Sequence, residues 1–264
     1  MESVKSSKNK IVIANWKMKL SLKESIDLAN DLKNYCKVFK KGSVVVCPNF
    51  MSIIEVKKIL KDTPIVIGSQ DVFWEQQGAY TGEVSPSMVL EAGCEYAIIG
   101  HSERRKYMLE NYEMIHQKLK AVLNTDGITP IVCIGENEDE RKTDRRDFVL
   151  VHQLQQSLGG ISLLENQQVI IAYEPIWAIG SGIAIEPEEA VYAHKIIKLT
   201  LNDMFGPQVS SNNFKIIYGG SISSKIVKDF VDLENIDGLL VGGASLNAEE
   251  FCKVAKAMLA SSKK

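Results

Sequence analysis

Polar residues that could carry chemistry follow several short apolar runs of the sequence. Glu174 stands at the end of the run 169–173 and precedes a proline, which ends a strand because it has no N–H to donate. His101 follows the run 96–99 across one glycine, and Lys17 comes shortly after the run 11–14. A carboxylate can remove a proton, an imidazole can donate a hydrogen bond to a carbonyl, and an ammonium group can offset negative charge.

The stretch 176–182, Ile-Trp-Ala-Ile-Gly-Ser-Gly, has an unusual composition for a loop because it is apolar and ends in glycines. Such a segment is typical of a lid whose apolar face closes on a ligand. A tight strand-to-helix turn is the alternative. If Glu174 lies under such a lid, closure removes water from its carboxylate, and we expect this desolvation to make the glutamate a stronger base.

Glycine pairs suggest an anion site. Gly219-Gly220 and Gly242-Gly243 each follow an apolar run, and Gly180 ends the proposed lid. Glycine lets an anion approach the backbone, whose N–H groups can hold a phosphate at a helix start. One such pair more often marks a turn, but two pairs at consecutive strand ends favour phosphate binding. The sequence contains no Walker or Gly-x-Gly-x-x-Gly motif, which disfavours a nucleotide cofactor.

The sequence gives little support to a metal site. His101 is the only histidine at a strand end, since His116, His152 and His194 fall within predicted helices. We therefore expect no metal and no cofactor. A structural role for His101 and a solvated surface position for Lys17 are the alternatives when each residue is considered alone. At a strand-to-helix junction, a helix N-terminus disfavours the imidazolium form of His101.

The elements that would position these residues follow a regular alternation. Eight runs rich in Val and Ile are continuous, as expected for parallel strands covered on both faces, and segments of helical period separate them. This pattern predicts an α/β fold, a single (β/α)8 barrel of eight parallel strands within an outer ring of helices. An open doubly wound sheet is the alternative. The runs are 11–14, 44–46, 65–67, 96–99, 129–133, 169–172, 215–218 and 239–241.

Composition limits the possible classes of function. The chain has 264 residues, a net charge of −2 and no apolar run long enough to span a membrane, so we expect neither a nucleic-acid nor a membrane partner. The five scattered cysteines favour a reducing compartment. We expect residues 1–9 to form a disordered polar tail and residues 10–264 a single catalytic domain. The charged stretch 136–147 is interpreted as a solvated loop that leads into a helix.

These motifs together resemble the triosephosphate isomerase family. The resemblance extends from Lys10 to the last predicted helix, with the motifs in the family's order, and the combination is highly specific. It implies the TIM barrel. The matching motifs are Asn-Trp-Lys-Met at 15–18, Gly-Ala-Tyr-Thr-Gly-Glu at 78–83, Ile-Gly-His-Ser-Glu-Arg-Arg at 99–105, Cys-Ile-Gly-Glu at 133–136, Tyr-Glu-Pro-Ile-Trp-Ala-Ile-Gly at 173–180, Tyr-Gly-Gly-Ser at 218–221 and Val-Gly-Gly-Ala-Ser-Leu at 241–246.

By this resemblance the chain interconverts dihydroxyacetone phosphate and D-glyceraldehyde 3-phosphate through an enediolate, in glycolysis and gluconeogenesis. Glu174 would remove the proton next to the carbonyl, while His101 and Asn15 would polarise the substrate oxygens. Lys17 would stabilise negative charge and Glu103 would position that lysine, although an ion pair between Glu103 and a neighbouring arginine is the alternative. A glutamate base beside a neutral histidine is the established pattern of this family.

The resemblance also implies how the phosphate and a second subunit bind. Backbone N–H groups of Gly180, Ser221 and Gly243, next to Gly242, would hold the phosphate, and a lid over 175–182 would exclude water. The family is a cytoplasmic homodimer in which the loop carrying Thr81 enters the partner's site. The segment 72–82 is apolar and aromatic for an exposed loop, which independently favours an interface.

Departures from the family pattern concern the lid and the interface. Ser181 stands where threonine is frequent, and Ile185-Glu186 replaces the usual small residues, so we expect altered lid kinetics. Asp71 replaces the usual asparagine and could alter hydrogen bonding at the interface, and the stretch 138–146 lacks the usual glycine. Two other classes of function compete. Glu103 and Glu174 could be a glycosidase pair, or the barrel could bind a ligand without catalysis.

Overall fold

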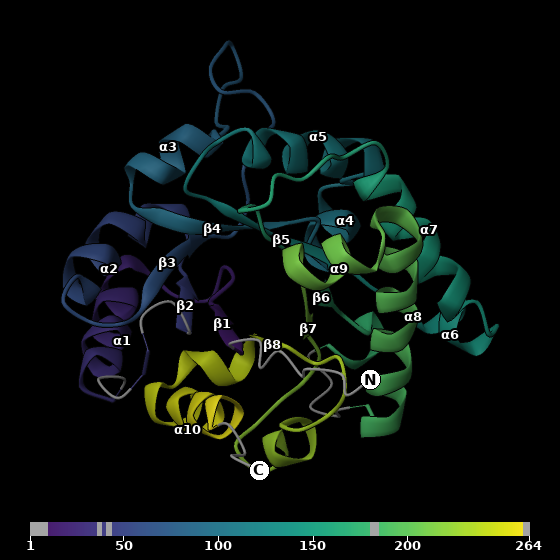
Figure 1. Ribbon diagram of the computed structural model, residues 1–264. Helices are drawn as coiled ribbons and strands as arrows, with labels where there is room; N and C mark the ends of the chain where they lie inside the picture. The colour runs from purple at the N-terminus through teal and green to yellow at the C-terminus, as the bar shows by residue number, and fades with distance from the viewer. Residues whose placement is uncertain (1–9, 36–38, 41–43, 180–184, 261–264) are drawn as a thin grey trace.

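Eight parallel strands close into a barrel in the order of the sequence, and β8 pairs with β1 (Figure 1). The computed structural model describes residues 10–35, 39–40, 44–179 and 185–260. The closed ring confirms the predicted (β/α)8 barrel and excludes the open doubly wound sheet. The strands are β1 (Ile11–Asn15), β2 (Val44–Cys47), β3 (Val66–Ser69), β4 (Cys94–Ile99), β5 (Thr129–Ile134), β6 (Val169–Tyr173), β7 (Phe214–Tyr218) and β8 (Gly238–Val241).

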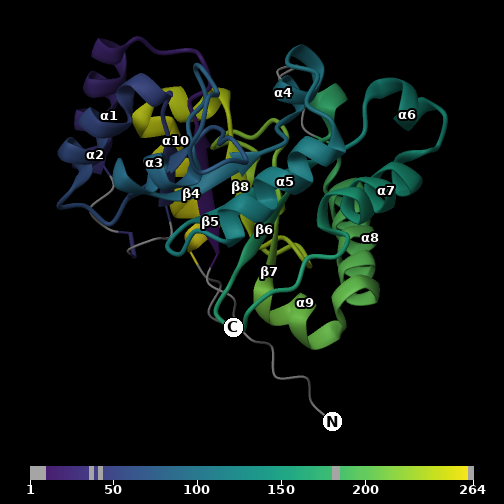
Figure 2. The same ribbon diagram turned by 90° about the horizontal axis from the view of Figure 1, so that it is seen from above.

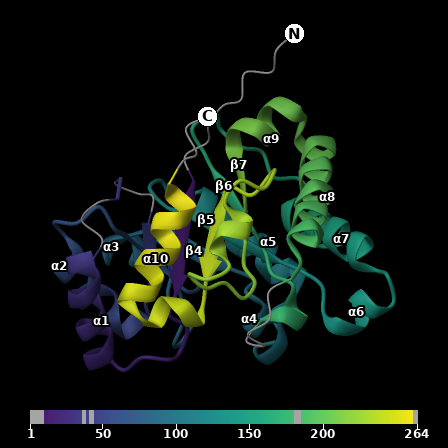
Figure 3. The ribbon, with the colours of Figure 1, turned by 90° about the horizontal axis from the view of Figure 1, so that it is seen from below.

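Helices surround the barrel, and short 3-10 helices follow several strands (Figure 1). The α-helices are α1 (Leu22–Tyr35), α2 (Ile53–Leu60), α3 (Pro86–Glu91), α4 (Ser102–Tyr107), α5 (Tyr112–Leu123), α6 (Glu138–Lys142), α7 (Arg146–Leu158), α8 (Pro187–Phe205), α9 (Pro207–Asn213) and α10 (Ala248–Leu259). The 3-10 helices are η1 (Phe50–Ser52), η2 (Ile176–Ala178), η3 (Val227–Phe230) and η4 (Gly243–Leu246). In Figures 2 and 3, α4 and α6 lie toward one end of the barrel and α9 toward the other. None of the described helices is both long and apolar enough to cross a membrane.

The continuous apolar character of the strands follows from burial on both faces. Along β1, Ile11 and Ile13 join a cluster made of strand residues alone, which fills the barrel interior. Val12 and Ala14, which alternate with them, join a second cluster that also contains helix residues. Because successive strand side chains point to opposite faces, one strand contributes to both clusters. If polar residues had alternated with apolar residues along the strands, either the barrel interior or the layer between strands and helices would have lacked apolar side chains.

Side-chain caps begin several of the helices. The Ser21 backbone N–H donates to the Glu24 carboxylate, and the Glu24 N–H donates to the Ser21 hydroxyl, as a capping box requires. Ser85 accepts from the N–H of Met88 at the start of α3. Asn247 accepts from the Glu250 N–H at the start of α10. These short-range bonds depend on local sequence, which explains why they could be predicted.

One expectation from the sequence was wrong in part. The stretch 136–147 contains helix α6 as well as a loop, and Glu136 at its start is fully buried. A capping box between Asn137 and Glu140 begins this helix. Cys252 on α10 is disulfide-bonded. The free cysteines Cys47, Cys94 and Cys133 are buried.

Candidate active site

Glu174, at the end of β6, is a buried charged group at the carboxyl ends of the strands. Its side chain is 1% exposed. The Glu174 backbone N–H donates to the Ile134 carbonyl oxygen at 2.7 Å, which continues the β5–β6 pairing past the strand end. Its carboxylate lies 3.0 Å from His101 Nε2 and accepts from the Ser102 N–H at 3.1 Å. The sheet therefore fixes the backbone of Glu174, and residues at the start of α4 fix its carboxylate.

Glycines make room for this residue on both neighbouring strands. A Cβ added to Gly135, after β5, would lie 1.7 Å from the Glu174 carbonyl oxygen. A Cβ at Gly219, after β7, would lie 3.0 Å from Glu174 Cγ. A real Cβ atom does not approach backbone atoms so closely, so a side chain at position 135 would collide with the backbone of Glu174. Gly135 is therefore required at this position. These two glycines serve the position of the base, whereas the sequence had suggested Gly219 for phosphate binding.

The hydrogen bonds of His101 assign its tautomer. His101 is the N-cap residue of α4, and its Nδ1 accepts from the Glu103 backbone N–H at 3.2 Å. Because Nδ1 accepts a hydrogen bond, the proton of a neutral ring lies on Nε2, which faces the Glu174 carboxylate. The geometry therefore directs Nε2 of His101 toward Glu174 and its Nδ1 toward the Glu103 backbone N–H.

The pKa of Glu174 differs from the expectation for a desolvated base. Burial acts to raise it, but His101, the charge of Arg105 and the Ser102 N–H act more strongly in the opposite direction, so the pKa of Glu174 is lowered. Desolvation alone thus gave the wrong sign for the arrangement seen here. The carboxylate is ionised at neutral pH and available as a proton acceptor.

Lys17 and Glu103 form an ion pair across the mouth of the barrel. The Lys17 Nζ lies 2.7 Å from Glu103 Oε1, and the lysine side chain is only 19% exposed. Lys17 has a φ of 53°, a left-handed backbone that is uncommon outside glycine. Asn15 Oδ1 accepts from the Lys17 N–H at 3.0 Å, and Gln70 Nε2 donates to the Lys17 carbonyl oxygen at 2.9 Å. These two amides hold the strained residue on both sides.

Gln70 was not assigned a role from the sequence. It follows β3 directly, and its amide also donates to the Cys47 carbonyl oxygen at the end of β2, at 2.9 Å. A polar residue at a strand end was the available signal, since Glu174 also follows its strand directly. Gln70 thereby connects three consecutive strand ends beneath Lys17.

Asp71 lies in a buried cluster of charges within the chain. Its oxygens lie 2.7 Å from Lys118 Nζ and 2.9 Å from an Arg104 nitrogen, and both cations also contact Glu110 at 2.8 Å. Burial raises the pKa of Asp71 to about 6, against the opposing charge of Lys118. Arg104 is engaged here, so Glu103 pairs with Lys17 as predicted.

The phosphate-binding candidates Ser221, Gly242 and Gly243 follow β7 and β8, two strands that pair in the barrel. A Cβ at Gly242 would lie 3.4 Å from Lys17 Cε, which places this glycine beside the lysine. A Cβ at Gly243, where η4 begins, would meet no atom of the described residues within 4 Å. The Ser221 hydroxyl donates to the Ala178 carbonyl oxygen at 2.8 Å. Gly180 and Ser181 lie outside the described residues.

Glu136 is a buried residue that sequence reasoning missed. One oxygen of its carboxylate accepts from the Tyr173 hydroxyl at 3.1 Å and from Trp177 Nε1 at 2.9 Å. Burial raises the pKa of Glu136, and these hydrogen bonds oppose that shift. In the sequence, Glu136 stands at the start of a charged run, which suggested that its side chain is exposed to solvent. Its position directly after Gly135 at a strand end was the better signal.

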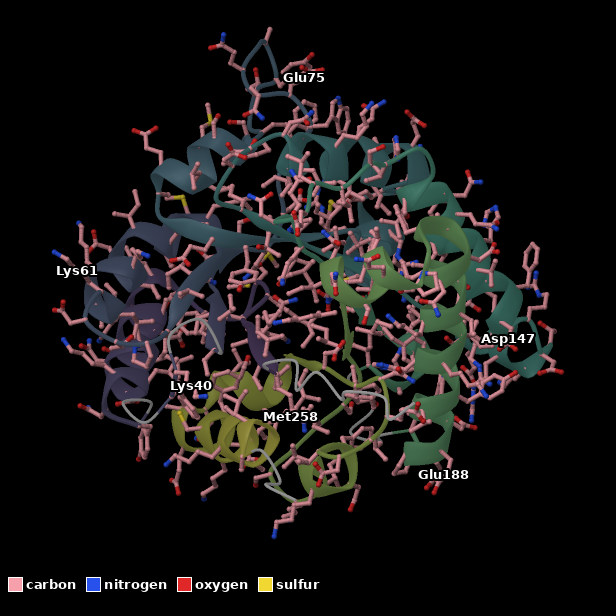
Figure 4. All side chains as sticks on the ribbon, viewed as in Figure 1. Lys40, Lys61, Glu75, Asp147, Glu188 and Met258 are labelled. Atoms are coloured by element: carbon pink, nitrogen blue, oxygen red, sulfur yellow. The ribbon has the colours of Figure 1, made fainter. Side chains whose placement is uncertain are left out.

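Thr81 belongs to a loop that projects from the ring of helices. Figure 1 shows this loop beyond α3 and α5, and Glu75, labelled in Figure 4, lies on it. Residues 75–83 are exposed, while Phe73 stacks on Trp74 and contacts Tyr80 at the base of the loop. The loop thus reaches away from the strands of its own barrel.

A family profile described as triosephosphate isomerase matches residues 10–258 of this chain. The chain belongs to the triosephosphate isomerase family. The triosephosphate isomerase of Dictyoglomus turgidum is 39% identical over 249 residues, which cover 94% of this chain and 99% of that protein. That of Dehalococcoides mccartyi strain CBDB1 is 42% identical over 246 residues, covering 93% and 95% of the two chains. That of Caldanaerobacter subterraneus subsp. tengcongensis is 41% identical over 244 residues, covering 92% and 97%. The match includes every candidate site residue of this family member.

Proposed function

We propose that this site interconverts dihydroxyacetone phosphate and D-glyceraldehyde 3-phosphate by moving a proton through an enediolate. Membership of the triosephosphate isomerase family supports this reaction. The observation that carries the assignment of residues is the direct contact between the buried carboxylate of Glu174 and Nε2 of His101. It brings a proton acceptor and a hydrogen-bond donor to one point of the barrel mouth.

The ionised carboxylate of Glu174 acts as the base. It takes the proton from the carbon next to the substrate carbonyl, and the electron pair of that C–H bond forms the enediolate. The protonated carboxyl then returns the proton to the adjacent carbon, while the hydroxyl proton passes from one substrate oxygen to the other, which gives the other isomer. Burial of the carboxylate keeps competing water away from the proton during this transfer. The low pKa ensures that Glu174 begins each turnover ionised.

His101 and Lys17 act on the oxygens, where charge develops. The Nε2–H of His101 donates to the substrate oxygen in place of Glu174, and a neutral imidazole can do so without first losing a proton. The ammonium of Lys17 offsets the negative charge of the enediolate and phosphate, and Glu103 holds that ammonium. The amide of Asn15 adds a second polar contact beside it, because its oxygen is fixed by the Lys17 N–H.

Phosphate binds at the ends of β7 and β8. The N–H groups of Ser221 and Gly243, with Gly242 beside Lys17, provide donors where no side chain blocks an anion. Gly180, which lies outside the described residues, would complete this set. The same arrangement weighs against a glycosidase, since Glu103 is held by Lys17 and a sugar substrate has no use for an anion site.

The decisive test is an isomerisation assay of the wild type and Glu174→Gln with triose phosphates. Loss of the base is expected to lower kcat by roughly 10²-fold to 10⁴-fold or more, with little change in KM. Glu95→Gln provides a matched control, because Glu95 lies on β4 and pairs with exposed Lys57 away from the site. An inactive wild type, or a Glu174→Gln variant at full rate, would contradict the proposal.

We further propose that two copies of the chain form a homodimer in the cytoplasm, where triose phosphates are supplied. Apolar side chains are exposed in the loops that follow β1, β2 and β4: Met18 is 95% exposed, Met51 83% and Leu109 79%. Exposed apolar surface of this kind is typical of a protein interface. The projecting loop with Thr81 provides a shape that could insert between such loops on a partner.

A further inference from the structure

Trp177 is held on two sides by residues of the segment that follows β5. Its indole Nε1 donates to the buried Glu136 carboxylate at 2.9 Å. The guanidinium carbon of Arg141 on α6 lies 3.8 Å from the centre of the indole ring. A cation over an aromatic face is attracted by the negative charge density of the ring. The indole is therefore fixed both at its edge and over its face.

Arg141 is itself held by a second helix. Its Nη2 lies 3.0 and 3.1 Å from the two carboxylate oxygens of Glu189, in the first turn of α8. The two side chains are 41% and 36% exposed, so the ion pair alone contributes little. Its geometric effect is to fix the plane of the guanidinium over Trp177. One arginine thus connects α6, the residues after β6 and the start of α8.

The segment that carries Trp177 also carries the proposed base. Glu174 stands three positions before Trp177, and Pro175 between them restricts the backbone. The Ile176 N–H donates to the Glu136 carbonyl oxygen at 3.0 Å. Because η2 is short and bound at these points, a displacement of Trp177 would be transmitted to the Glu174 carboxylate.

We propose that Arg141 and Glu189 are positioning residues for the isomerisation, which act by holding the indole of Trp177 and thereby the segment next to Glu174. This inference rests on the proposed function for its kinetic part. Arg141 is specific in this role, because a planar guanidinium can stack on the ring and contact both carboxylate oxygens, whereas the ammonium of a lysine is a point charge without a stacking plane. Neither residue contacts the substrate.

The test compares three variants with a matched control. Arg141→Met removes the guanidinium, Arg141→Lys keeps the charge without the plane, and Glu189→Gln removes the partner. Lys142→Met is the control, because Lys142 is the next residue of α6 and pairs only with exposed Glu138 among the described contacts. Steady-state kcat and KM are measured with triose phosphates. Acrylamide quenching of fluorescence is measured for each protein and its Trp177→Phe counterpart, so that the difference isolates Trp177.

Arg141→Met and Arg141→Lys are expected to lower kcat roughly 2-fold to 5-fold, the range that corresponds to a cation–aromatic contact at a partly exposed site, with KM nearly unchanged. Acrylamide quenching of Trp177 should increase in both variants, and Lys142→Met should match the wild type. The double variant Arg141→Met with Glu189→Gln should be no slower than Arg141→Met alone, because Glu189 acts through Arg141.

Several results would overturn the inference. If Arg141→Met matches Lys142→Met in kcat and quenching, or if its kcat rises, Arg141 does not position the segment. Additive losses in the double variant would show that Glu189 acts independently. An inactive wild type would contradict the proposed function instead, and the quenching data would still decide whether Arg141 holds Trp177. Circular dichroism melting identifies any variant that fails to fold, in which case Arg141→Lys provides the comparison.

Discussion

Replacing Lys118 by methionine tests the buried charge cluster most directly. Lys118 Nζ lies 2.7 Å from Asp71 and 2.8 Å from Glu110, and all three side chains are 3–6% exposed. Methionine fills a similar volume but provides no charge and no hydrogen bond. Both carboxylates would then depend on Arg104 alone, which is one third exposed. The variant therefore leaves buried negative charge without adequate compensation.

The magnitude follows from the cost of breaking a buried ion pair, which is about 3–5 kcal/mol when one partner is removed. For a chain of this size, each kcal/mol shifts Tm by roughly 2–4 °C, so the expected drop is about 6–20 °C. Lys120→Met is the matched control, because Lys120 lies on the same helix α5 but is exposed. We expect the control to stay within about 0.5 kcal/mol of the wild type.

The pH dependence supplies a second, independent check. The pKa of Asp71 is raised from 3.8 to about 6, so the folded chain disfavours its ionised form. Asp71 therefore destabilises the folded chain when it is ionised. This destabilisation is fully present above pH 6 and absent below pH 3.8, so the stability of the folded chain rises as pH falls between these values. Lys118 is a cause that lowers this pKa, so its removal raises the pKa further. The deficit of Lys118→Met should therefore be largest at pH 7.5 and smaller at pH 5.

Urea unfolding at fixed protein concentration, at pH 7.5 and pH 5, measures both effects. A deficit below about 1 kcal/mol at pH 7.5 would show that Lys118 is not needed to compensate the two acids. A deficit that is equal at the two pH values would refute the part of the reasoning that depends on Asp71. Either result would mean that water or Arg104 compensates the cluster.

Two further predictions concern the phosphate site and the interface. Gly243→Ala should fold normally, because its Cβ would meet no atom of the described residues within 4 Å. KM should nevertheless rise about 10-fold or more, as the methyl group displaces an anion that accepts a hydrogen bond. An unchanged KM, with an unchanged melting curve, would refute phosphate binding there. Thr81→Arg should convert a dimer to a monomer, because a long charged side chain on the projecting loop cannot be buried in a partner's site. Sedimentation velocity measures this change. Identical profiles for wild type and variant would argue against this interface.

Local sequence patterns were sufficient for the strands, the caps and the main members of the site. The strands were visible because burial on both faces requires continuous apolar runs, as in Val169–Tyr173. Glu174, His101 and Lys17 were identifiable because each follows such a run, and parallel strands in a barrel bring their carboxyl ends together. Family motifs then distinguished among the chemistries that these residues could perform.

Features that depend on distant contacts could not be predicted. The pairing of Arg141 with Glu189 joins residues 48 positions apart, and the charge cluster joins Asp71 to Lys118 across 47 positions. Side-chain type does not reveal which of many possible partners a charge will meet. The pKa of Glu174 was predicted with the wrong sign for the same reason, because its donors come from α4 and could not be located in advance.

The pairing of β1 with β8 has a consequence for when a refolding chain becomes active. Glu174 and His101 come from the middle of the chain, on strands separated only by β5, so they can meet once that part of the sheet has formed. Lys17 and Gly242 follow the first and last strands, and a Cβ at Gly238 would lie 2.0 Å from the Ile11 carbonyl oxygen, so this junction requires a glycine. Contacts between the ends of a chain carry the greatest loop-closure cost and form late. The proposed base and imidazole therefore lie within one part of the sheet, whereas the proposed anion site requires the first and last strands to pair.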